Sequence, residues 1–371
     1  MKNRRYISTI RLSLARGSRL RAEALQSTAS SRHSISYSLE FSFLLRQDWL
    51  ALRIAFAVDE PMADSPTPHV NAGPFRTLRK GQVSEVRFLE IGAAHHITIG
   101  CFDRLVEAPN WLPEREQLIV NGSGALHRLC LDDDTQLDEI ACAGITDVNN
   151  DHVLSPDGND IYISAAGCIY ALPLEGGIPR RISPESHLAF YLHGVSPDGS
   201  TLACTTKNVR DPHASWGLHT FLAAGGPASA LIVSDIPVDG PEWTPDGEWI
   251  WFNAEIEADR PGHARLFRIR PDGSQRERMT HGDRVDWFPH PSPDGQWIAY
   301  LSYPPETLGH PADMPVEIRL IPASGGEPVT LASFNGGQGS LNVNSWAADS
   351  RRFAYVAYPD ADLSSAKAQT R

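Results

Sequence analysis

A four-residue phrase, Ser/Thr-Pro-Asp-Gly, constrains the fold of this chain more than any other feature. It occurs at Ser155–Gly158, Ser196–Gly199, Thr244–Gly247 and Ser292–Gly295. The proline fixes its own φ, the aspartate can bind backbone two residues on, and the glycine supplies the positive φ of a tight turn. An apolar run typical of a β-strand follows each copy, as in Trp249–Phe252. Each copy therefore predicts a turn that leads into a strand.

Two weaker copies, Leu112–Arg115 and Ala347–Ser350, extend the series to six turns. The turns begin near residues 113, 156, 197, 245, 293 and 348, with gaps of 43, 41, 48, 48 and 55 residues. A period of this length in units of short strands is typical of propeller blades, which bury their faces by stacking on their neighbours. We therefore predict an all-β fold, a six-bladed β-propeller.

The two ends of the repeat region predict how the ring closes. Two strand candidates, Val86–Ile91 and His95–Ile99, have no turn phrase of their own, and the last unit stops soon after Phe353–Tyr358. Pairing the two ends would remove open sheet edges. We expect the N-terminal strands to complete the C-terminal blade, with the propeller spanning residues 73–360 and a tail at residues 361–371.

The N-terminal part has a different composition. Residues 1–58 hold ten Lys/Arg and three Asp/Glu and so carry +7, whereas the whole chain carries −12. Charged residues interrupt every apolar run before it reaches membrane-spanning length. It is either an organellar-type targeting segment or a stretch upstream of a more natural start at Met62. We expect residues 1–72 to be a basic, poorly ordered extension outside the fold, although the alternation at 35–43 also fits a strand.

The acidic remainder of the chain argues against several classes of partner. It shows no Lys/Arg stripe for nucleic acid or anionic lipid, no apolar span for a membrane, and no glycine-rich loop for a nucleotide cofactor. Five scattered cysteines without metal-binding spacing favour reduced thiols. We expect a cytoplasmic monomer, or a periplasmic protein if its true start differs.

The repeats resemble those of a known family. The turn phrases, together with the later Gly-Gly-x-Pro turns at Gly176–Pro179 and Gly325–Pro328, look like the WD-like repeats of TolB-type six-bladed propellers. The resemblance covers about residues 107–358 and implies one function, a non-catalytic scaffold that binds a protein partner. Prolyl-oligopeptidase-type enzymes share the repeat, but no G-x-S-x-G motif occurs here.

Candidate functional residues lie just before each turn, because the first strand of a propeller blade lines the central channel. The residues six before the turn proline or its equivalent are Glu107, Asn150, Tyr191, Asp239, Trp287 and Asn342. Those four before it are Pro109, His152, His193, Pro241, Pro289 and Asn344. Those three before it are Asn110, Val153, Gly194, Glu242, His290 and Ser345. The polar members of these sets, with Gln338, are expected to converge on the channel mouth.

Three interpretations of this cluster remain open. The polar groups could simply bind loop backbone and channel water. They could instead bind a saccharide, with aromatic faces stacking on the sugar and polar groups holding its hydroxyls. The ligand-binding set is then Glu107, Asn110, Asn150, Tyr191, Trp287, Asn342 and Asn344. The catalytic candidates are His152, His193, Asp239 and Glu242.

The third interpretation places one divalent metal among His152, His193, His290 and Gln338. Imidazoles and a carbonyl oxygen suit Mn, Fe, Ni or Zn. This set resembles the metal site of oligogalacturonate lyases, which implies lyase- or hydrolase-type chemistry on a saccharide or uronate. Two segments could add to the mouth. Residues 207–230 are either a substrate-side loop or a degraded strand pair, and the insertion Glu306–Pro315, with His310, could overhang the opening.

Overall fold

The structure is a computed structural model that describes residues 76–362, with gaps at 94, 113–114, 132–135 and 212–214, and the backbone of four strands between residues 21 and 59. The chain divides into two compact units, residues 1–67 and 68–371. The predicted boundary at residue 72, the turn residues 113–114 and most of the predicted tail lie outside the described residues.

The first unit contains an antiparallel sheet built around β3, which pairs with each of the other three strands. The strands are β1 (Arg21–Ala24), β2 (Thr28–Ser31), β3 (Ser34–Leu45) and β4 (Asp48–Asp59). β3 spans the alternating stretch at residues 35–43. Its pairing with β4 runs from Ser34 opposite Asp59 to Leu45 opposite Asp48, so the two strands form a long hairpin.

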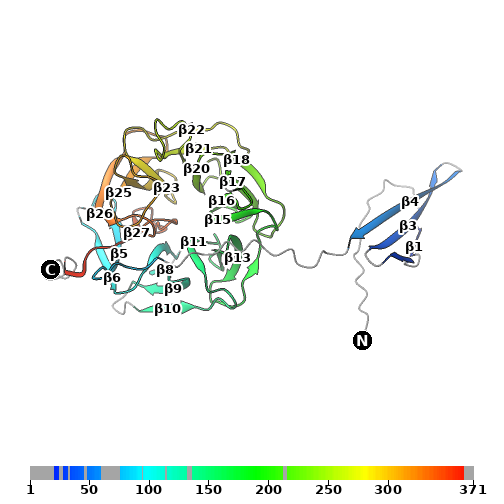
Figure 1. The fold of residues 1–371 in the computed structure, drawn as a ribbon, viewed down its shortest axis with the longest axis horizontal. Coiled ribbons are helices and arrows are strands. Elements are labelled where there is room, and N and C mark those ends of the chain that lie inside the picture. Colours follow the sequence, from blue (N-terminus) through cyan, green and yellow to red (C-terminus); the bar gives the residue numbers. More distant parts are fainter. Residues whose placement is uncertain are drawn as a thin grey trace. The chain divides into compact units, whose positions relative to one another are not determined.

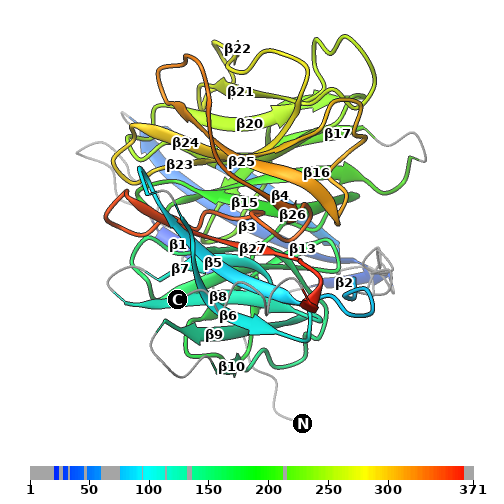
Figure 2. The same ribbon diagram turned by 90° about the vertical axis from the view of Figure 1, so that its left-hand side faces the viewer.

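The second unit is a ring of six sheets, a six-bladed β-propeller as predicted (Figures 1 and 2). The strands of blades one and two are β7 (Glu107–Trp111), β8 (Gln117–Gly122), β9 (Ala125–Cys130), β10 (Leu137–Ile140), β11 (Val148–Leu154), β12 (Asp160–Ala165), β13 (Cys168–Pro173) and β14 (Arg180–Arg181). Those of blades three and four are β15 (Leu188–Val195), β16 (Thr201–Asn208), β17 (Trp216–Leu222), β18 (Ser229–Ser234), β19 (Val238–Trp243), β20 (Ile250–Ala254), β21 (Arg265–Ile269) and β22 (Glu277–Arg278). Those of blade five are β23 (Val285–Pro291), β24 (Trp297–Tyr303), β25 (Met314–Pro322) and β26 (Val329–Gly336).

The sixth blade is assembled from both ends of the propeller. Its sheet has the order β27 (Arg352–Ala357), β5 (Ser84–Glu90) and β6 (Ile97–Phe102). β27 pairs antiparallel with β5, and a bridge between Trp346 and Phe353 takes the innermost position. The predicted closure of the ring by N-terminal strands is therefore confirmed, and the sheet edges at both ends are covered.

The repeated turns form a ring on one face of the propeller, which we call the turn face. In the first strong copy the Ser155 hydroxyl donates to Asp157 at 2.6 Å, and Gly158 takes a φ of 69°. Neighbouring turns touch, because a Cβ added at Gly199 would lie 3.5 Å from the ring of Pro156. The same contact recurs at Gly247 and Gly295, so each of the first three strong copies touches the next one along the chain.

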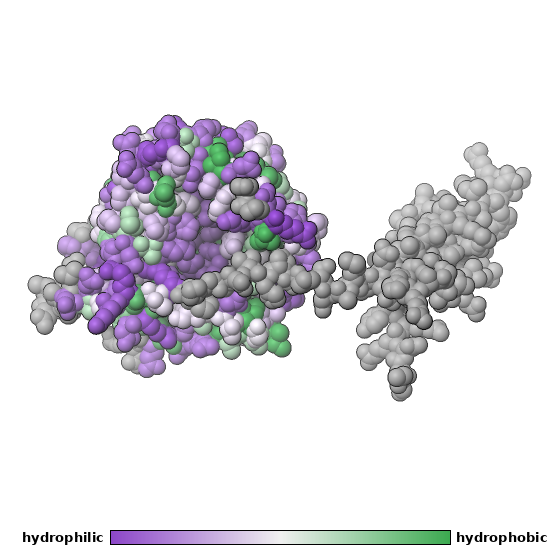
Figure 3. Space-filling model, in the orientation of Figure 1, coloured by the Kyte–Doolittle hydropathy of each residue, from purple (hydrophilic) through white to green (hydrophobic). Residues whose placement is uncertain are grey.

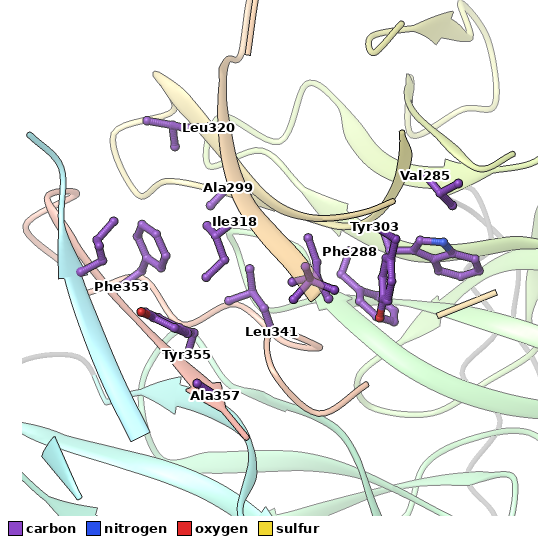
Figure 4. Packing of buried hydrophobic residues seen from close by; sticks show 14 of the residues in the cluster. Val285, Phe288, Ala299, Tyr303, Ile318, Leu320, Leu341, Phe353, Tyr355 and Ala357 are labelled. Carbon is purple, nitrogen blue, oxygen red and sulfur yellow. The ribbon is translucent and has the colours of Figure 1, made fainter. Parts of the chain in front are cut away.

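The hydrophobic core lies between neighbouring blades rather than at the centre of the ring. Between blades five and six, Ile318 and Tyr303 pack with Phe353 and Tyr355, and all four are completely buried (Figure 4). Leu89 of β5, which pairs with Phe353, belongs to the same cluster, so burial of its apolar surface also joins the N-terminal strands to the C-terminal blade.

A β-bulge interrupts the inner strand of each of the first five blades at the same place. The register shifts lie between Glu107 and Asn110, Val148 and His152, Leu192 and Gly194, Asp239 and Glu242, and Trp287 and His290. In four of these blades the shift adds one residue, which breaks the alternation of side chains between the two faces of the strand, and in blade two it adds two residues. These bulges decide which side chains of the inner strands enter the channel.

Candidate functional site

The centre of the ring is hollowed and its visible wall is largely hydrophilic (Figure 3). At the end of the channel away from the turn face lies a cavity of about 330 Å³, which we call the Asp239 cavity. The predicted site residues that line it are Asn150, Tyr191, His193, Asp239, Gln338 and Asn342. They come from blades two, three, four and six, so the ring does bring distant predicted residues together.

A buried ion pair between Asp239 and His193 occupies the centre of this cavity. His193 Nε2 lies 3.1 Å from Asp239 Oδ1, which also accepts from the Thr205 hydroxyl at 2.6 Å and from the Gly240 N–H at 2.8 Å. Burial would raise the pKa of Asp239, but the bond and charge of His193 hold it well below its usual range. Asp239 is therefore an ionised carboxylate that its neighbours keep in one orientation.

A second carboxylate, Asp151, lines the same cavity beside the pair. Burial raises the pKa of Asp151, while the charge of His193 opposes the rise. Burial would also lower the pKa of His193, but Asp151 and Asp239 outweigh that effect and hold it above its ordinary range. The cavity therefore holds two carboxyl groups with pKa values shifted in opposite directions around one imidazolium.

The insertion in blade five places His310 at the mouth, as the sequence suggested. His310 Nδ1 lies 2.5 Å from Gln338 Oε1, and its Nε2 lies 3.8 Å from Asp239 Oδ2. Gln338 in turn donates to Asn150 Oδ1 at 3.3 Å. The side chains of Asn150, Gln338 and His310 thus form a connected series that reaches from the rim of the cavity to Asp239.

Aromatic rings form the apolar part of the wall. Tyr191, Trp216 and Phe288 line the cavity, and the ammonium of Lys207 lies 4.8 Å from the centre of the Trp216 ring. Within the described part of the segment 207–230, β17 pairs with the start of β18, so a strand pair is present and forms the outer half of blade three. Trp216, the first residue of β17, lies at the mouth of the cavity.

Two predicted ligand-binding residues lie behind the cavity wall. Trp287 is 3% exposed and packs against His310, with ring centres 4.4 Å apart. Glu107 is bound by Arg76 at 3.2 Å, and Arg76 also donates to the Gln338 carbonyl at 2.8 Å. Burial raises the pKa of Glu107 to about 7, although Arg76 opposes the rise. Both residues support the rim instead of facing the cavity.

Four other predicted residues, Asn110, Glu242, His290 and Asn344, gather at the other end of the channel. A cavity of about 210 Å³ at the turn face, which we call the Asn110 cavity, is lined by Asn110, Glu242 and Asn344 among others. His290 Nδ1 lies 2.7 Å from Glu242 Oε2, and its Nε2 lies 3.0 Å from the Leu341 carbonyl. His193 lines both cavities and so separates the two ends of the channel.

The predicted metal set is not assembled. His152 is completely buried outside both cavities, and burial lowers its pKa to about 4. Both nitrogens of His290 are engaged by Glu242 and a backbone carbonyl, which leaves only His193 and Gln338 facing the Asp239 cavity. Within the described part of the chain, no group of three or more His, Cys, Asp or Glu could hold a metal ion. The residues present therefore do not fit the expected metal site.

Comparisons with known proteins place the chain in a family. An uncharacterized protein of Agrobacterium fabrum is 38% identical over 294 residues, which cover 78% of this chain and 96% of the relative. A solved structure from Agrobacterium tumefaciens, provisionally named TolB, is 35% identical with a TM-score of 0.69 and is covered to 99%, against 75% of this chain. The chain belongs to the TolB-like propeller family. A TolB homolog of Chlorobium luteolum matches more locally, at 28% identity over 134 residues, or 36% of this chain and 28% of the relative.

Other comparisons add nothing about the site of this TolB-like propeller. No family model matches its sequence. An oligogalacturonate lyase solved with manganese is 15% identical with a TM-score of 0.47, covering 68% of this chain and 74% of the lyase, a similarity too low to transfer a metal or a substrate. Among the described residues, no helix has the length and apolar character needed to cross a membrane.

Sequence reasoning missed several cavity residues of the TolB-like propeller. Asp151 and Phe288 each stand five residues before their turn proline, a position expected to face away from the channel in a regular strand. The bulge in each inner strand turns them into the cavity, and Phe288 adopts a positive φ of 55° there. Thr205 lies on the second strand of blade three, outside the positions considered, and Lys207 on the same strand was named only as the start of the segment 207–230. The available signal for Asp151 was a carboxylate directly before the predicted His152.

Proposed function

We propose that this TolB-like propeller binds a saccharide in the Asp239 cavity. The observation that carries the proposal is the composition of the cavity wall, in which aromatic rings alternate with buried, oriented hydrogen-bonding groups. Tyr191 and Trp216 offer faces on which a sugar ring can stack. Asn150, Asn342 and Asp239 offer donors and acceptors at the depth where hydroxyl groups would lie.

The charge balance of the cavity favours a ligand without a strong charge. Asp239 and His193 neutralise each other at 3.1 Å, and the neighbouring Asp151 has a raised pKa. Lys207 is drawn toward the Trp216 ring. A neutral saccharide would keep these pairs intact, whereas a uronate would have to compete with Asp239 for His193.

Acid–base chemistry on the bound saccharide would be carried out by the titratable groups of the Asp239 cavity. A carboxyl group with a raised pKa can donate a proton, and an ionised neighbour can accept one. Asp151 and Asp239 have these properties, and His193 lies between them. Lyase- or hydrolase-type activity is therefore proposed for these three residues and not for His152, which is buried elsewhere.

Calorimetric titration of the full chain with neutral oligosaccharides and with uronates tests the proposal. Trp216→Leu should weaken saccharide binding about tenfold, because it removes a stacking face. Trp249→Leu is the matched control, since Trp249 packs under Arg268 and Arg270 away from both cavities. Saccharide binding that is equally strong in both variants would overturn the proposal.

The alternative that the family resemblance raises is a scaffold for a protein partner. In that case no saccharide would bind or raise the melting temperature, whereas a bound ligand stabilises the folded state by mass action. A thermal-shift screen of a panel of sugars and uronates separates the two functions, because any member that binds the folded protein raises its melting temperature.

A further inference from the structure

The Asn110 cavity at the turn face contains an acceptor that the protein leaves unused. Asn110 is 5% exposed, and its Nδ2 donates to the Asn344 carbonyl. A carbonyl oxygen only accepts, so this bond fixes which end of the amide is which. Asn110 Oδ1 has no hydrogen-bond partner among the described residues. A buried amide oxygen held in this way calls for a donor from a ligand.

Two donors near this acceptor already have partners within the protein. Asn344 Nδ2 donates to Glu242 Oε1, and the Trp346 indole N–H donates to the His290 carbonyl at 3.0 Å. Glu242, which lines the cavity, is an acceptor when ionised. The polar side of the cavity therefore presents the oxygens of Asn110 and Glu242, beside His193, whose Nδ1 has no hydrogen-bond partner among the described residues.

The rest of the wall is aromatic. Trp111, Trp243 and Trp346 line the cavity, each from a position two residues before its turn proline or the equivalent. Tryptophan attracts cations more strongly than the other aromatic side chains do. The volume of about 210 Å³ equals that of about seven waters in liquid, so it suits a small molecule.

The electrostatic surroundings favour a cation as well. The repeated turns place an exposed aspartate around this mouth in five of the six blades. They are Asp157, Asp198, Asp246, Asp294 and Asp349, the last of which is paired with Arg352 at 2.8 Å. Hydrogen bonds from the turn hold Asp157 and Asp198 in the ionised form, since Ser155 and Ser196 donate to them. A ring of negative charge around an aromatic opening raises the local concentration of cations.

We propose that the Asn110 cavity is a second ligand site, which binds a small organic ammonium through Asn110 Oδ1, the Glu242 carboxylate and the three tryptophan rings. This site is separate from the Asp239 cavity, and His193 lies between the two. The ammonium N–H donates to Asn110 Oδ1, and its apolar body packs among the tryptophans. The site does not depend on the proposed saccharide function.

Titration of the full chain with cyclohexylammonium chloride, followed by calorimetry and tryptophan fluorescence, tests the proposal. Cyclohexylammonium should bind at least about tenfold more tightly than cyclohexanol, which lacks the charge, and than tetramethylammonium, which lacks an N–H. Raising the ionic strength should weaken the binding. Equal binding of cyclohexanol, or no binding of cyclohexylammonium, would refute the proposal without any variant.

A variant locates the site. Asn110→Leu keeps the approximate shape of the side chain and removes the acceptor, so the affinity for cyclohexylammonium should fall about tenfold. Asn208→Leu, at the end of β16 away from the turn face, is the matched control and should bind as the natural protein does. If Asn110→Leu folds and retains full affinity, the ammonium binds elsewhere and the assignment is wrong.

Discussion

Replacing Asp239 by asparagine should destabilise the propeller and change the protonation of His193. The two side chains lie 3.1 Å apart and are both buried. At an effective dielectric constant of about 20, opposite unit charges at this separation attract by about 5 kcal/mol. Removing one member of a buried pair typically costs about 3–5 kcal/mol, because the other charge is left without compensation. Asp151 also favours the charged form of His193 and will absorb part of the loss, so we expect about 3 kcal/mol.

The pH dependence of this loss follows from the two pKa shifts. The pKa of Asp239 is lowered, so its contribution exists above about pH 4 and disappears as the pH falls toward the folded-state value. The pKa of His193 is raised, so its contribution is complete below about pH 6.5 and disappears as the pH rises through the folded-state value. The difference in unfolding free energy between the natural protein and Asp239→Asn should therefore be widest near about pH 5–6 and narrow in strong base.

Urea denaturation of the single variants Asp239→Asn and His193→Gln and of the double variant measures the coupling between the two residues. We expect a coupling energy above about 1.5 kcal/mol. The NMR titration of His193 should move to lower pH in Asp239→Asn, because the nearest negative charge is gone. Additive losses together with an unchanged His193 titration would refute the reasoning.

Three further predictions concern the closure of the propeller ring, the rim of the Asp239 cavity and metal binding. Phe353→Ala empties a completely buried position between the joined ends of the propeller. It should lower the unfolding free energy, measured in urea, by about 3–5 kcal/mol. A loss below about 1 kcal/mol would contradict the closure of the ring. Gly339→Ala should lower the melting temperature and weaken saccharide binding, since Gly339 has a φ of 87° and its Cβ would meet Glu107 and the Tyr358 hydroxyl; an unchanged melting temperature would argue against this placement of the rim. Chelator should leave the melting temperature unchanged, because His152 and His290 do not face the cavity; a drop that manganese reverses would restore the metal hypothesis.

The blade count and the closure were predictable because both follow from short-range chemistry. Each turn phrase encodes its own local geometry, and the spacing of the turns reports the number of blades. The pairing of β27 with β5 follows from the need to cover open edges, and Phe353 and Tyr355 supply the apolar surface that secures it.

The site was only partly predictable, because a bulge has no strong signature in a single sequence. Asn150, Tyr191 and Asp239 reach the cavity from position six before the turn; Tyr191 and Asp239 precede the register shift of their strand, and Asn150 lies within it. In blade two the irregular pairing extends from Val148 to His152, and His152 is buried outside both cavities. Alignment on the turn proline alone therefore grouped residues from both ends of the channel into one predicted cluster. It placed Glu242 at the wrong end of the channel.

The position of the insertion in blade five was predicted from the sequence, but its contacts were not. His310 reaches the mouth because its segment leaves β24 and returns into β25 at that end of blade five. Its ring is held by Trp287 and by Gln338, contacts across 23 and 28 residues of sequence that periodicity alone does not encode. The sequence could suggest the overhang but not the bond to Gln338.

A crystal structure of the protein grown with its best-binding neutral saccharide would be the most direct test of saccharide binding in the Asp239 cavity. The account predicts a sugar ring in the Asp239 cavity, stacked on Tyr191 or Trp216, with hydroxyls bound by Asp239 and Asn150. Density for the saccharide only at the turn face or on the outer blades, with the Asp239–His193 pair untouched, would contradict it.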